Sequence, residues 1–371
     1  MLGAPRFRHV SLAAAAAALA LVLSACSGED RPGGSGPAAS ASLDREADLS
    51  KQRLTVSNWD GYLPEDLPAR FKSAVGPSVT VAKHTTNEEI VAKLTASADS
   101  GIDVAFVSGQ YAQALAAQGL LEPIHHDLVP HLANLDPLAS RLAHDKGNVY
   151  SVPYTWGTTG LCYRKDLVGR APDSWNDLLK PRPAVKKKIT MLKTERWLFL
   201  PAQKALGYSV NTTDEQQLAR VKELLLTAKK GLLAYDDTTF GDRLKSGETA
   251  LAEAWDGWCP TDDERIGFVV PKEGSDLWTD TMVVLKSSKN KEAAHAFINY
   301  VLDAKVHSWV ASNIFYKVPN DAAMAEIDPA LLKRYPALAM TPEQLIRGES
   351  VVDVGDASTA YTRIVTEVTA G

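Results

Sequence analysis

The sequence predicts an α/β protein of two domains built on parallel β-sheets. The chain has 371 residues, and this length favours two domains rather than one. In its first ordered part, strand-like and helix-like segments alternate three times, which is the pattern of a parallel sheet with crossover helices. The composition, 45% hydrophobic and 23% charged residues, is that of a globular protein.

The first elements follow from local patterns. Apolar positions alternate in RLTVSNW (53–59), and SVTVAKH (78–84) has the character of a second strand. Thr86 begins a capping box with Glu89, so we expect a helix over the residues that follow. IDVAFV (102–107) is a continuous apolar run, typical of a strand that is buried on both faces.

The middle and the end of the chain repeat this style. Thr213 opens a second capping box, TDEQ, ahead of a helix with leucines on one face. The segments 250–255 and 266–270 are predicted strands, and residues 290–305 form a strongly amphipathic helical pattern. The strand–helix alternation therefore continues beyond the first domain.

The N-terminus has the features of an export signal. A basic start with Arg6 and Arg8 precedes an apolar run (10–23) that is too short to span a bilayer comfortably. LSAC (23–26) resembles a bacterial lipobox, which predicts a signal peptide over 1–25 and a lipid on Cys26; an ordinary secretory signal with a chance cysteine is the alternative. Residues 26–50 are rich in Gly, Ser, Pro and Ala, as expected of a flexible tether. We therefore expect an exported protein, lipid-anchored at the outer face of the cytoplasmic membrane.

Charge and motif content exclude several functions. Removal of two arginines and no acid with the signal peptide would bring the net charge from −5 to −7, whereas nucleic-acid binding needs a basic surface. No GxSxG, HExxH or P-loop motif is present. The histidines of HHDLVPH (125–131) lack the spacing of a metal site and fit a solvated loop better. We expect no nucleic acid, no metal, no cofactor and no enzymatic activity.

Two cysteines remain after Cys26, namely Cys162 and Cys259. In an oxidising compartment they can pair, but two buried free thiols are equally compatible with the sequence.

Tryptophans beside Gly or Asp at predicted strand ends indicate a ligand site. They occur in NWDGY, YTWGTTG, AWDGWCP and LWTD, with Asp60, Asp256 and Asp280 next to the rings. Ligands of α/β sheets bind at the carboxyl ends of strands, and both an aromatic face and a carboxylate favour an organic cation. Any one of these tryptophans could instead fill the core; the set favours a cation site.

These motifs resemble the substrate-binding proteins of bacterial polyamine (spermidine/putrescine) ABC transporters. The similarity runs from about residue 54 to about residue 365. It is carried by NWDGY, TNEEIVAKL, NLDP, YSVPYTWGTTGLCY, SWNDLLKP, LGYSVNTTD, SGETALAEAW, PKEGSDLWTDTMVV, HAFINYVLD and YKVPNDAA.

The resemblance implies a two-lobed fold of the type II periplasmic-binding-protein class, with the ligand in the cleft between the lobes. Lobe 1 would comprise 51–155 plus 280–325, and lobe 2 would comprise 156–279 plus 326–371. It also implies that the protein binds a small cationic amine and delivers it to the permease subunits of an ABC transporter.

The resemblance further implies a set of cleft residues. These are Trp59, Tyr62, Ser108, Trp255, Trp278, Asp280 and Tyr316. Asp280 would bind an ammonium group. Departures from the family pattern fall on Gln110, Thr194, Trp197, Trp258 and Val351, of which Thr194 and Trp197 stand where spermidine-binding members carry acids.

Two ligand hypotheses follow from these departures. In one, the ligand is a linear polyamine, and Asp60, Asp256 or Glu195 replaces the missing acids. In the other, the ligand is a smaller monocation, such as a monoamine or a quaternary ammonium, held by the rings and Asp280 alone. A non-transport sensor subunit on the same fold is a further alternative, because fold does not determine function.

Overall fold

The computed structural model describes residues 43–370. The predicted signal peptide, Cys26 and most of the predicted tether lie outside the described residues. Within them, no helix combines the length and the apolar character needed to cross a membrane.

The first sheet has seven strands. Five follow the order β12-β11-β3-β1-β2, and β4 and β5 also pair with β11. The strands are β1 (Arg53–Trp59), β2 (Ser78–His84), β3 (Val104–Ser108), β4 (Leu121–Glu122), β5 (Ser151–Gly157), β11 (Asp276–Leu285) and β12 (Glu349–Ser350). The ladders among β1, β2 and β3 are parallel, as predicted, whereas β11 is antiparallel to β3, β4 and β5. Every residue of β3 is buried, which confirms a strand covered on both faces.

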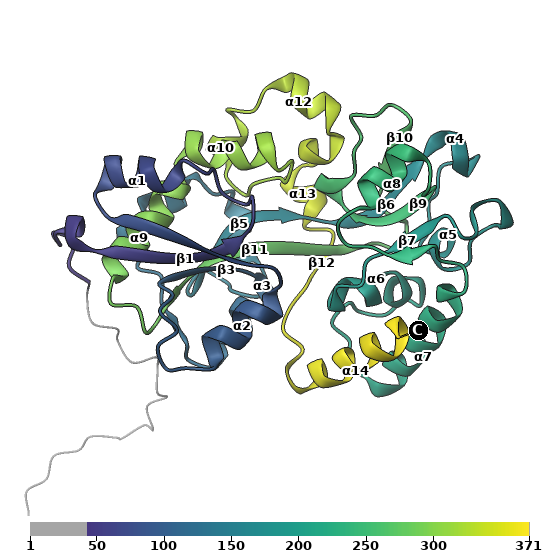
Figure 1. The fold of residues 1–371 in the computed structure, drawn as a ribbon, viewed down its shortest axis with the longest axis horizontal. Helices are drawn as coiled ribbons and strands as arrows, with labels where there is room; N and C mark the ends of the chain where they lie inside the picture. The colour runs from purple at the N-terminus through teal and green to yellow at the C-terminus, as the bar shows by residue number, and fades with distance from the viewer. Residues whose placement is uncertain (1–42, 371) are drawn as a thin grey trace, which may run out of the picture. The chain divides into compact units, whose positions relative to one another are not determined.

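Helices from two parts of the chain gather about this sheet (Figure 1). They are α1 (Leu67–Val75), α2 (Asn87–Thr95), α3 (Gly109–Ala117), α9 (Lys291–Val301) and α10 (Ala304–Asn313). The predicted cap of α2 is confirmed, because the Thr86 side chain accepts from the backbone N–H of Glu89. The Glu89 carboxylate accepts in return from the N–H of Thr85, one residue before the cap.

The second sheet has five strands in the order β10-β6-β9-β7-β8. They are β6 (Thr159–Arg164), β7 (Ile189–Met191), β8 (Ala234–Tyr235), β9 (Leu251–Trp255) and β10 (Ile266–Val269). β7 is parallel to β8 and β9, whereas β6 is antiparallel to β9 and β10. This sheet is therefore mixed rather than purely parallel.

Its helices are α4 (Lys165–Val168), α5 (Asn176–Leu179), α6 (Glu195–Ala205), α7 (Glu215–Lys229), α8 (Phe240–Ser246) and the C-terminal α14 (Ser358–Thr369). The prediction that Thr213 caps α7 is wrong by one residue. The cap is Asp214, whose carboxylate accepts from the N–H groups of Gln216 and Gln217. An Asp and a Thr in adjacent positions offer the same capping chemistry.

The remaining helices are short. They are α11 (Asp321–Met324), α12 (Pro329–Arg334) and α13 (Pro342–Leu345), with 3₁₀ turns at Leu49–Lys51, His126–Leu128, Pro130–Asn134, Pro137–Arg141, Pro183–Val185, Asp256–Trp258, Pro336–Ala339 and Gly355–Ala357.

Two paired strands of the first sheet, β5 and β11, lie where the chain passes between the two sheets. β5 ends at Gly157 and β6 begins at Thr159, so one residue separates the two sheets there. β11 runs beside β5 (Figure 1). In this ladder Trp278 lies opposite Gly157, and Asp280 lies opposite Thr155. The register of this ladder shifts between Asp280 and Thr281. β11 belongs to the first sheet along its whole length, and the lobe boundaries at 155/156 and 279/280 stay a prediction.

Candidate ligand-binding site

Asp280 lies where β3, β5 and β11 meet. Its Oδ1 accepts from the Ser108 hydroxyl at 2.7 Å, and its Oδ2 accepts from the Tyr62 hydroxyl at 2.8 Å. The Thr155 hydroxyl is 3.4 Å from the same Oδ2. Burial raises the pKa of Asp280, while the three hydroxyl contacts act in the opposite direction. The register explains the arrangement, because Asp280 pairs with Ser108 on one side and with Thr155 on the other.

Aromatic rings surround this carboxylate. Tyr62 stands between Trp59 and Tyr316, with ring centroids 5.4 and 6.1 Å away. Trp278 meets Tyr316 at 4.8 Å, edge to face. Trp278 is buried, and its indole N–H has no partner among the described residues. Four of the rings predicted from sequence thus form one cluster, which contacts Asp280 through Tyr62.

A second group of rings comes from the end of β9, the turn after it and the start of α6. Trp258 is stacked with Tyr316 at 6.2 Å and 10°, and Trp255 lies 5.9 Å from Trp258. Trp197, at the start of α6, meets Trp255 at 5.7 Å. Trp258 is 39% exposed, in contrast to the buried Trp197. The rings form a continuous series from Asp280 to Trp197.

Two glycines allow this packing. A Cβ at Gly157 would lie 2.2 Å from Cζ2 of Trp278 and 2.6 Å from Oδ1 of Asp256. A Cβ at Gly257 would lie 2.3 Å from Cδ1 of Tyr316. A real Cβ atom cannot come this close to another atom. The rings and Asp256 therefore occupy space that is free only because residues 157 and 257 are glycines.

Asp256 is a second buried carboxylate of the site. Its Oδ1 accepts from the N–H of Gly257 at 2.9 Å, and its Oδ2 accepts from the N–H of Thr158 at 3.3 Å. Burial raises the pKa of Asp256 to about 8. The pKa of Tyr316 is raised first by burial and then by the charges of Asp256 and Asp280, which places this phenol near both carboxylates.

A third carboxylate, Asp276, was missed by the sequence reasoning. It is buried and accepts from the Thr159 N–H and hydroxyl and from the Trp197 indole N–H. The Ser275 hydroxyl lies 3.1 Å from Oδ1 but makes its shorter bond, 2.6 Å, to the Thr159 carbonyl. Burial raises the pKa of Asp276. A signal was present in GSDLWTD, since Asp276, Trp278 and Asp280 have the period-2 spacing of one strand face.

These three carboxylates share one electrostatic property. Within residues 43–370, no Lys, Arg or His forms an ion pair with Asp256, Asp276 or Asp280. Buried charges are normally paired. Burial raises the pKa of all three carboxyls, and Lys317 interacts electrostatically with Asp256 without forming an ion pair with it.

Asp60 does not join this group, contrary to the sequence-based expectation. Its carboxylate is 75% exposed and forms an ion pair with Lys83. The reason is local: Asp60 follows the last residue of β1, and successive side chains point to opposite sides of a strand. We therefore leave Asp60 out of the proposed site.

The residues at and beside the positions that depart from the family pattern lie in different surroundings. Gln110 is buried in α3, and its Nε2 has no partner among the described residues. Thr194 precedes α6 as its cap residue, without a capping side-chain bond. Glu195 bonds instead to Thr362 on α14, at 2.6 Å. Val351 lies near Trp197 and Asp276, around a space too narrow for a water molecule.

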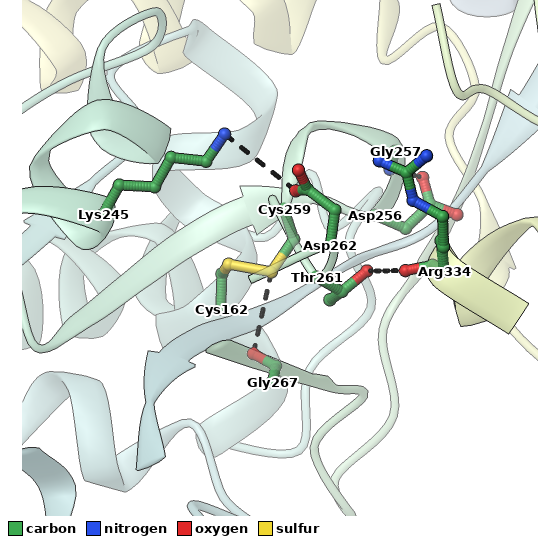
Figure 2. Close-up of a disulfide and its surroundings, with 9 residues drawn as sticks. All are labelled: Cys162, Lys245, Asp256, Gly257, Cys259, Thr261, Asp262, Gly267 and Arg334. Carbon is green, nitrogen blue, oxygen red and sulfur yellow. Dashed lines mark hydrogen bonds and ion pairs between the residues drawn. A yellow bond between two sulfur atoms is a disulfide. The ribbon is translucent and has the colours of Figure 1, made fainter. Parts of the chain in front are cut away.

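A disulfide supports the segment that carries Asp256 and Trp258. Cys259, directly after Trp258, is bonded to Cys162 on β6, which decides between the paired and free alternatives (Figure 2). Its sulfur lies 3.6 Å from the carbonyl of Gly267 on β10. The segment is thus tied to the second sheet on both sides of the 3₁₀ turn, by β9 before it and by the disulfide after it.

The histidines of 125–131 make separate local contacts. His126 bonds to the Asn148 carbonyl, and His131 bonds to Asn299. Among the described residues, no group of three or more His, Cys, Asp or Glu side chains could hold a metal ion.

Comparisons with known proteins agree with this architecture. The family model for bacterial extracellular solute-binding proteins matches residues 67–340. The chain is 30% identical over 322 residues to the spermidine/putrescine-binding periplasmic protein of Salmonella typhimurium, covering 86% of this chain and 92% of the relative. It is 31% identical over 294 residues to the putrescine/cadaverine-binding protein of Pseudomonas aeruginosa, covering 76% and 83%.

The crystal structure of the TpPotD lipoprotein of Treponema pallidum superposes with a TM-score of 0.76. The two chains are 26% identical, and the match covers 85% of this chain and 99% of that one. The fold is thus the two-lobed α/β fold of periplasmic binding proteins. The chain belongs to the bacterial extracellular solute-binding proteins, and among them to the non-enzymatic spermidine/putrescine-binding proteins of ABC transporters.

Proposed function

We propose that this protein captures a polyamine outside the cytoplasm and delivers it to an ABC permease, with Asp280 holding one ammonium group. The observation that carries the proposal is the environment of Asp280. Its carboxylate accepts only from neutral hydroxyls, has no basic partner among the described residues, and stands among aromatic rings. The names of the relatives support the same ligand class.

An ammonium ligand satisfies both features of this environment. It supplies the positive charge that the buried carboxylate lacks, through charge-assisted hydrogen bonds. Its methylene groups and its charge both suit ring faces, where a cation–π contact contributes roughly 0.5–2 kcal/mol. An anionic ligand would add charge of the same sign to a site that already contains buried carboxylates.

Closure of the two lobes is part of the proposal. Tyr62, Ser108 and Asp280 belong to the first sheet or the loops that leave it, whereas Trp255, Asp256 and Trp258 follow from the second sheet. A ligand that contacts both sets favours whichever arrangement brings them together, which is the basis of ligand-driven closure. The permease would then dock on the closed form.

Export and anchoring complete the proposal. We propose that Cys26 is lipidated and holds the protein at the outer face of the cytoplasmic membrane, on the strength of LSAC (23–26). A Cys26→Ala variant should move from the membrane fraction to the soluble fraction. If it stays in the membrane fraction, the anchor has another origin.

Titration of the purified protein with putrescine, spermidine and choline tests the ligand. Because several tryptophans line the site, binding should change their fluorescence. Asp280→Asn should weaken amine binding by about 2–5 kcal/mol, since it leaves a desolvated ammonium without its counter-charge. Asp60→Asn, in which the exposed ion pair with Lys83 is lost, is the control and should bind as the wild type does.

The outcomes separate the candidate functions. If no amine changes the fluorescence, the cation site does not exist. If choline binds and putrescine does not, the ligand is a monocation, in agreement with the second hypothesis. Unchanged affinity in Asp280→Asn would show that the ligand binds elsewhere.

A further inference from the structure

Phe315 has a backbone conformation that its residue type rarely adopts. Its φ is 64°, in the left-handed region, where the Cβ of an L-residue crowds the backbone. Among residues 43–370, the other non-glycine residues with a positive φ are Asn148 and Lys187. Asparagine is enriched in this region, whereas a bulky aromatic residue there is an outlier. The backbone at Phe315 is therefore strained.

Phe315 occupies the position after a helix end at which glycine is the usual residue. α10 ends at Asn313, and Ile314 is its C-cap, whose N–H bonds to the Val310 carbonyl. Helices commonly end with a left-handed residue directly after the C-cap, usually glycine and sometimes asparagine. A strained residue at such a position persists only where the surrounding structure holds it, and strained residues cluster at functional sites.

A second ring holds the side chain of Phe315. Tyr335 is stacked on it, with the ring centroids 4.1 Å apart and the planes 12° apart. Tyr335 belongs to a small apolar cluster with Ala311, Ile327 and Leu338, against which Phe315 packs. This stack stabilises the phenylalanine side chain in the position that the left-handed backbone gives it.

The segment that carries Tyr335 is tied to the loop after the disulfide. The Thr261 hydroxyl donates to the Arg334 carbonyl at 3.1 Å (Figure 2). Thr261 lies two residues after Cys259, and Tyr335 directly follows Arg334. The ring that supports Phe315 is therefore linked to the segment that the disulfide holds.

The backbone of Phe315 is also confined by the turn that follows β9. A Cβ on Gly257 would lie 2.5 Å from the Phe315 carbonyl oxygen and 2.3 Å from Cδ1 of Tyr316. The turn and these two residues are thus in direct contact, with no room for a side chain between them. A different φ at Phe315 would move this carbonyl and the residue that follows it.

The residue that follows Phe315 is the ring shared by both ring groups of the site. Tyr316 contacts three other rings, at centroid distances of 6.1, 4.8 and 6.2 Å, namely Tyr62, Trp278 and Trp258. One residue further on, the Lys317 carbonyl accepts from the Trp156 N–H on β5 at 3.0 Å. The direction of the Tyr316 ring therefore depends on the backbone angles between α10 and this bond.

We propose that Phe315 is a positioning residue: its left-handed backbone turns Tyr316 into the ligand site, and the stack with Tyr335 maintains that conformation. This inference rests on the proposed function, because Phe315 would act on amine binding through Tyr316. The alternative is that Phe315 only ends α10 and fills space beside Tyr335. Its backbone angle would then have no effect on ligand affinity.

Two substitutions separate the backbone angle from the ring. Phe315→Asn and Phe315→Val both remove the stack with Tyr335, but asparagine accepts the left-handed region and a β-branched valine does not. Both variants should melt at a lower temperature than the wild type. In calorimetric titrations with putrescine, Phe315→Asn should retain the wild-type affinity. Phe315→Val should bind roughly 5- to 30-fold more weakly, the factor that corresponds to the cost of a left-handed residue.

Tyr335→Leu tests the contribution of the stack. In the wild-type background this change should weaken putrescine binding, because Phe315 loses the ring that holds its conformation. In the Phe315→Asn background it should leave the affinity unchanged, since asparagine needs no such support. Equal effects of Tyr335→Leu in the two backgrounds would show that Tyr335 acts independently of Phe315, and would overturn the proposed coupling.

Near-UV circular dichroism of the ligand-free variants reports the packing of the rings without any amine. Phe315→Val should lose more of this signal than Phe315→Asn, although both variants lack the same ring. If Phe315→Val does not fold, Phe315→Asn decides alone: a loss of putrescine affinity in that variant would show that the ring matters and the backbone angle does not.

Failure of this inference differs from failure of the proposed function. If the wild type binds none of putrescine, spermidine and choline, the proposed function is wrong, and the near-UV comparison still tests the position of the rings. If Phe315→Asn and Phe315→Val bind putrescine equally and give the same near-UV signal, the positioning role is wrong and the proposed function stands.

Discussion

Replacement of Gly157 by alanine should distort the site through the two side chains that its added methyl group would displace. Gly157 ends β5 and pairs with Trp278 across the ladder to β11. Its φ is not positive, so alanine fits the backbone. The added methyl group, however, would lie 2.2 Å from Cζ2 of Trp278 and 2.6 Å from Oδ1 of Asp256. Both side chains must move.

The expected magnitude follows from these two contacts. Overpacking a tight interior costs about 1–3 kcal/mol. Trp278 cannot move without changing its 4.8 Å contact with Tyr316, and Asp256 cannot move without changing its two backbone bonds. If most of this strain must be relieved by moving the ring and the carboxylate out of place, putrescine affinity should fall by about 5- to 150-fold.

Calorimetry with putrescine and a thermal melt of each variant form the assay. The control is Gly160→Ala on β6, where a methyl group would lie 2.5 Å from the Phe268 ring and 2.6 Å from the Val269 carbonyl. This crowding is similar but lies outside the proposed site. We expect both variants to melt at a lower temperature and only Gly157→Ala to lose affinity. Equal putrescine affinity in Gly157→Ala and wild-type protein would refute the reasoning.

Three further predictions concern the disulfide, the pKa of Asp256 and the hydrogen bond from Tyr62 to Asp280. Replacing Cys162 and Cys259 with alanine frees chain segments 97 residues apart in sequence and should lower the unfolding free energy by up to about 4.7 kcal/mol; an unchanged denaturant midpoint would contradict this. The pKa of Asp256 is raised to about 8, so between roughly pH 4 and pH 8 the folded protein keeps a proton that the unfolded chain has lost. Stability of the ligand-free protein should therefore fall as pH rises through this window, by at most about 1.4 kcal/mol per unit, and the slope should be smaller in Asp256→Asn. Tyr62→Phe removes the 2.8 Å donor to Asp280, which should raise the pKa of that carboxylate and shift the onset of amine binding to higher pH; an unchanged pH profile would argue against a role for this bond.

Local patterns in the sequence were sufficient for much of the fold. β1, β2, β9 and β10 lie within a residue or two of their predicted ranges, because alternating or continuous apolar runs flanked by Gly and Pro are local signals. The cap at Thr86 was predicted for the same reason. The antiparallel entry of β11 into the first sheet was not predicted, since it depends on pairing with β3, which lies far away in the sequence.

The candidate site was predictable in type but not in detail. Tryptophans beside acids at strand ends indicated Trp278 and Asp280, whereas Tyr62 and Tyr316 were implied by the family resemblance. The structure brings these three rings together, with Tyr62 donating to Asp280. The same motif logic also selected Asp60, whose side chain the end of β1 directs into solvent. Adjacency to a tryptophan says nothing about which side of the backbone a carboxylate will occupy.

The sequence by itself determined the chemical character of this protein: an exported α/β chain with rings and acids at strand ends, and the residues that mark its family. Only the tertiary structure decided which hydrogen-bond donors each of these acids receives. Asp256 and Asp276 are similar in sequence context, each within two residues of a tryptophan. They differ because Asp276 accepts from the Thr159 N–H, the Thr159 hydroxyl and the Trp197 indole N–H, whereas Asp256 accepts from two backbone N–H groups alone. Donors such as Trp197 and Thr159 come from segments about 80 to 120 residues away, so the free capacity of a carboxylate is set by long-range packing that no local pattern records.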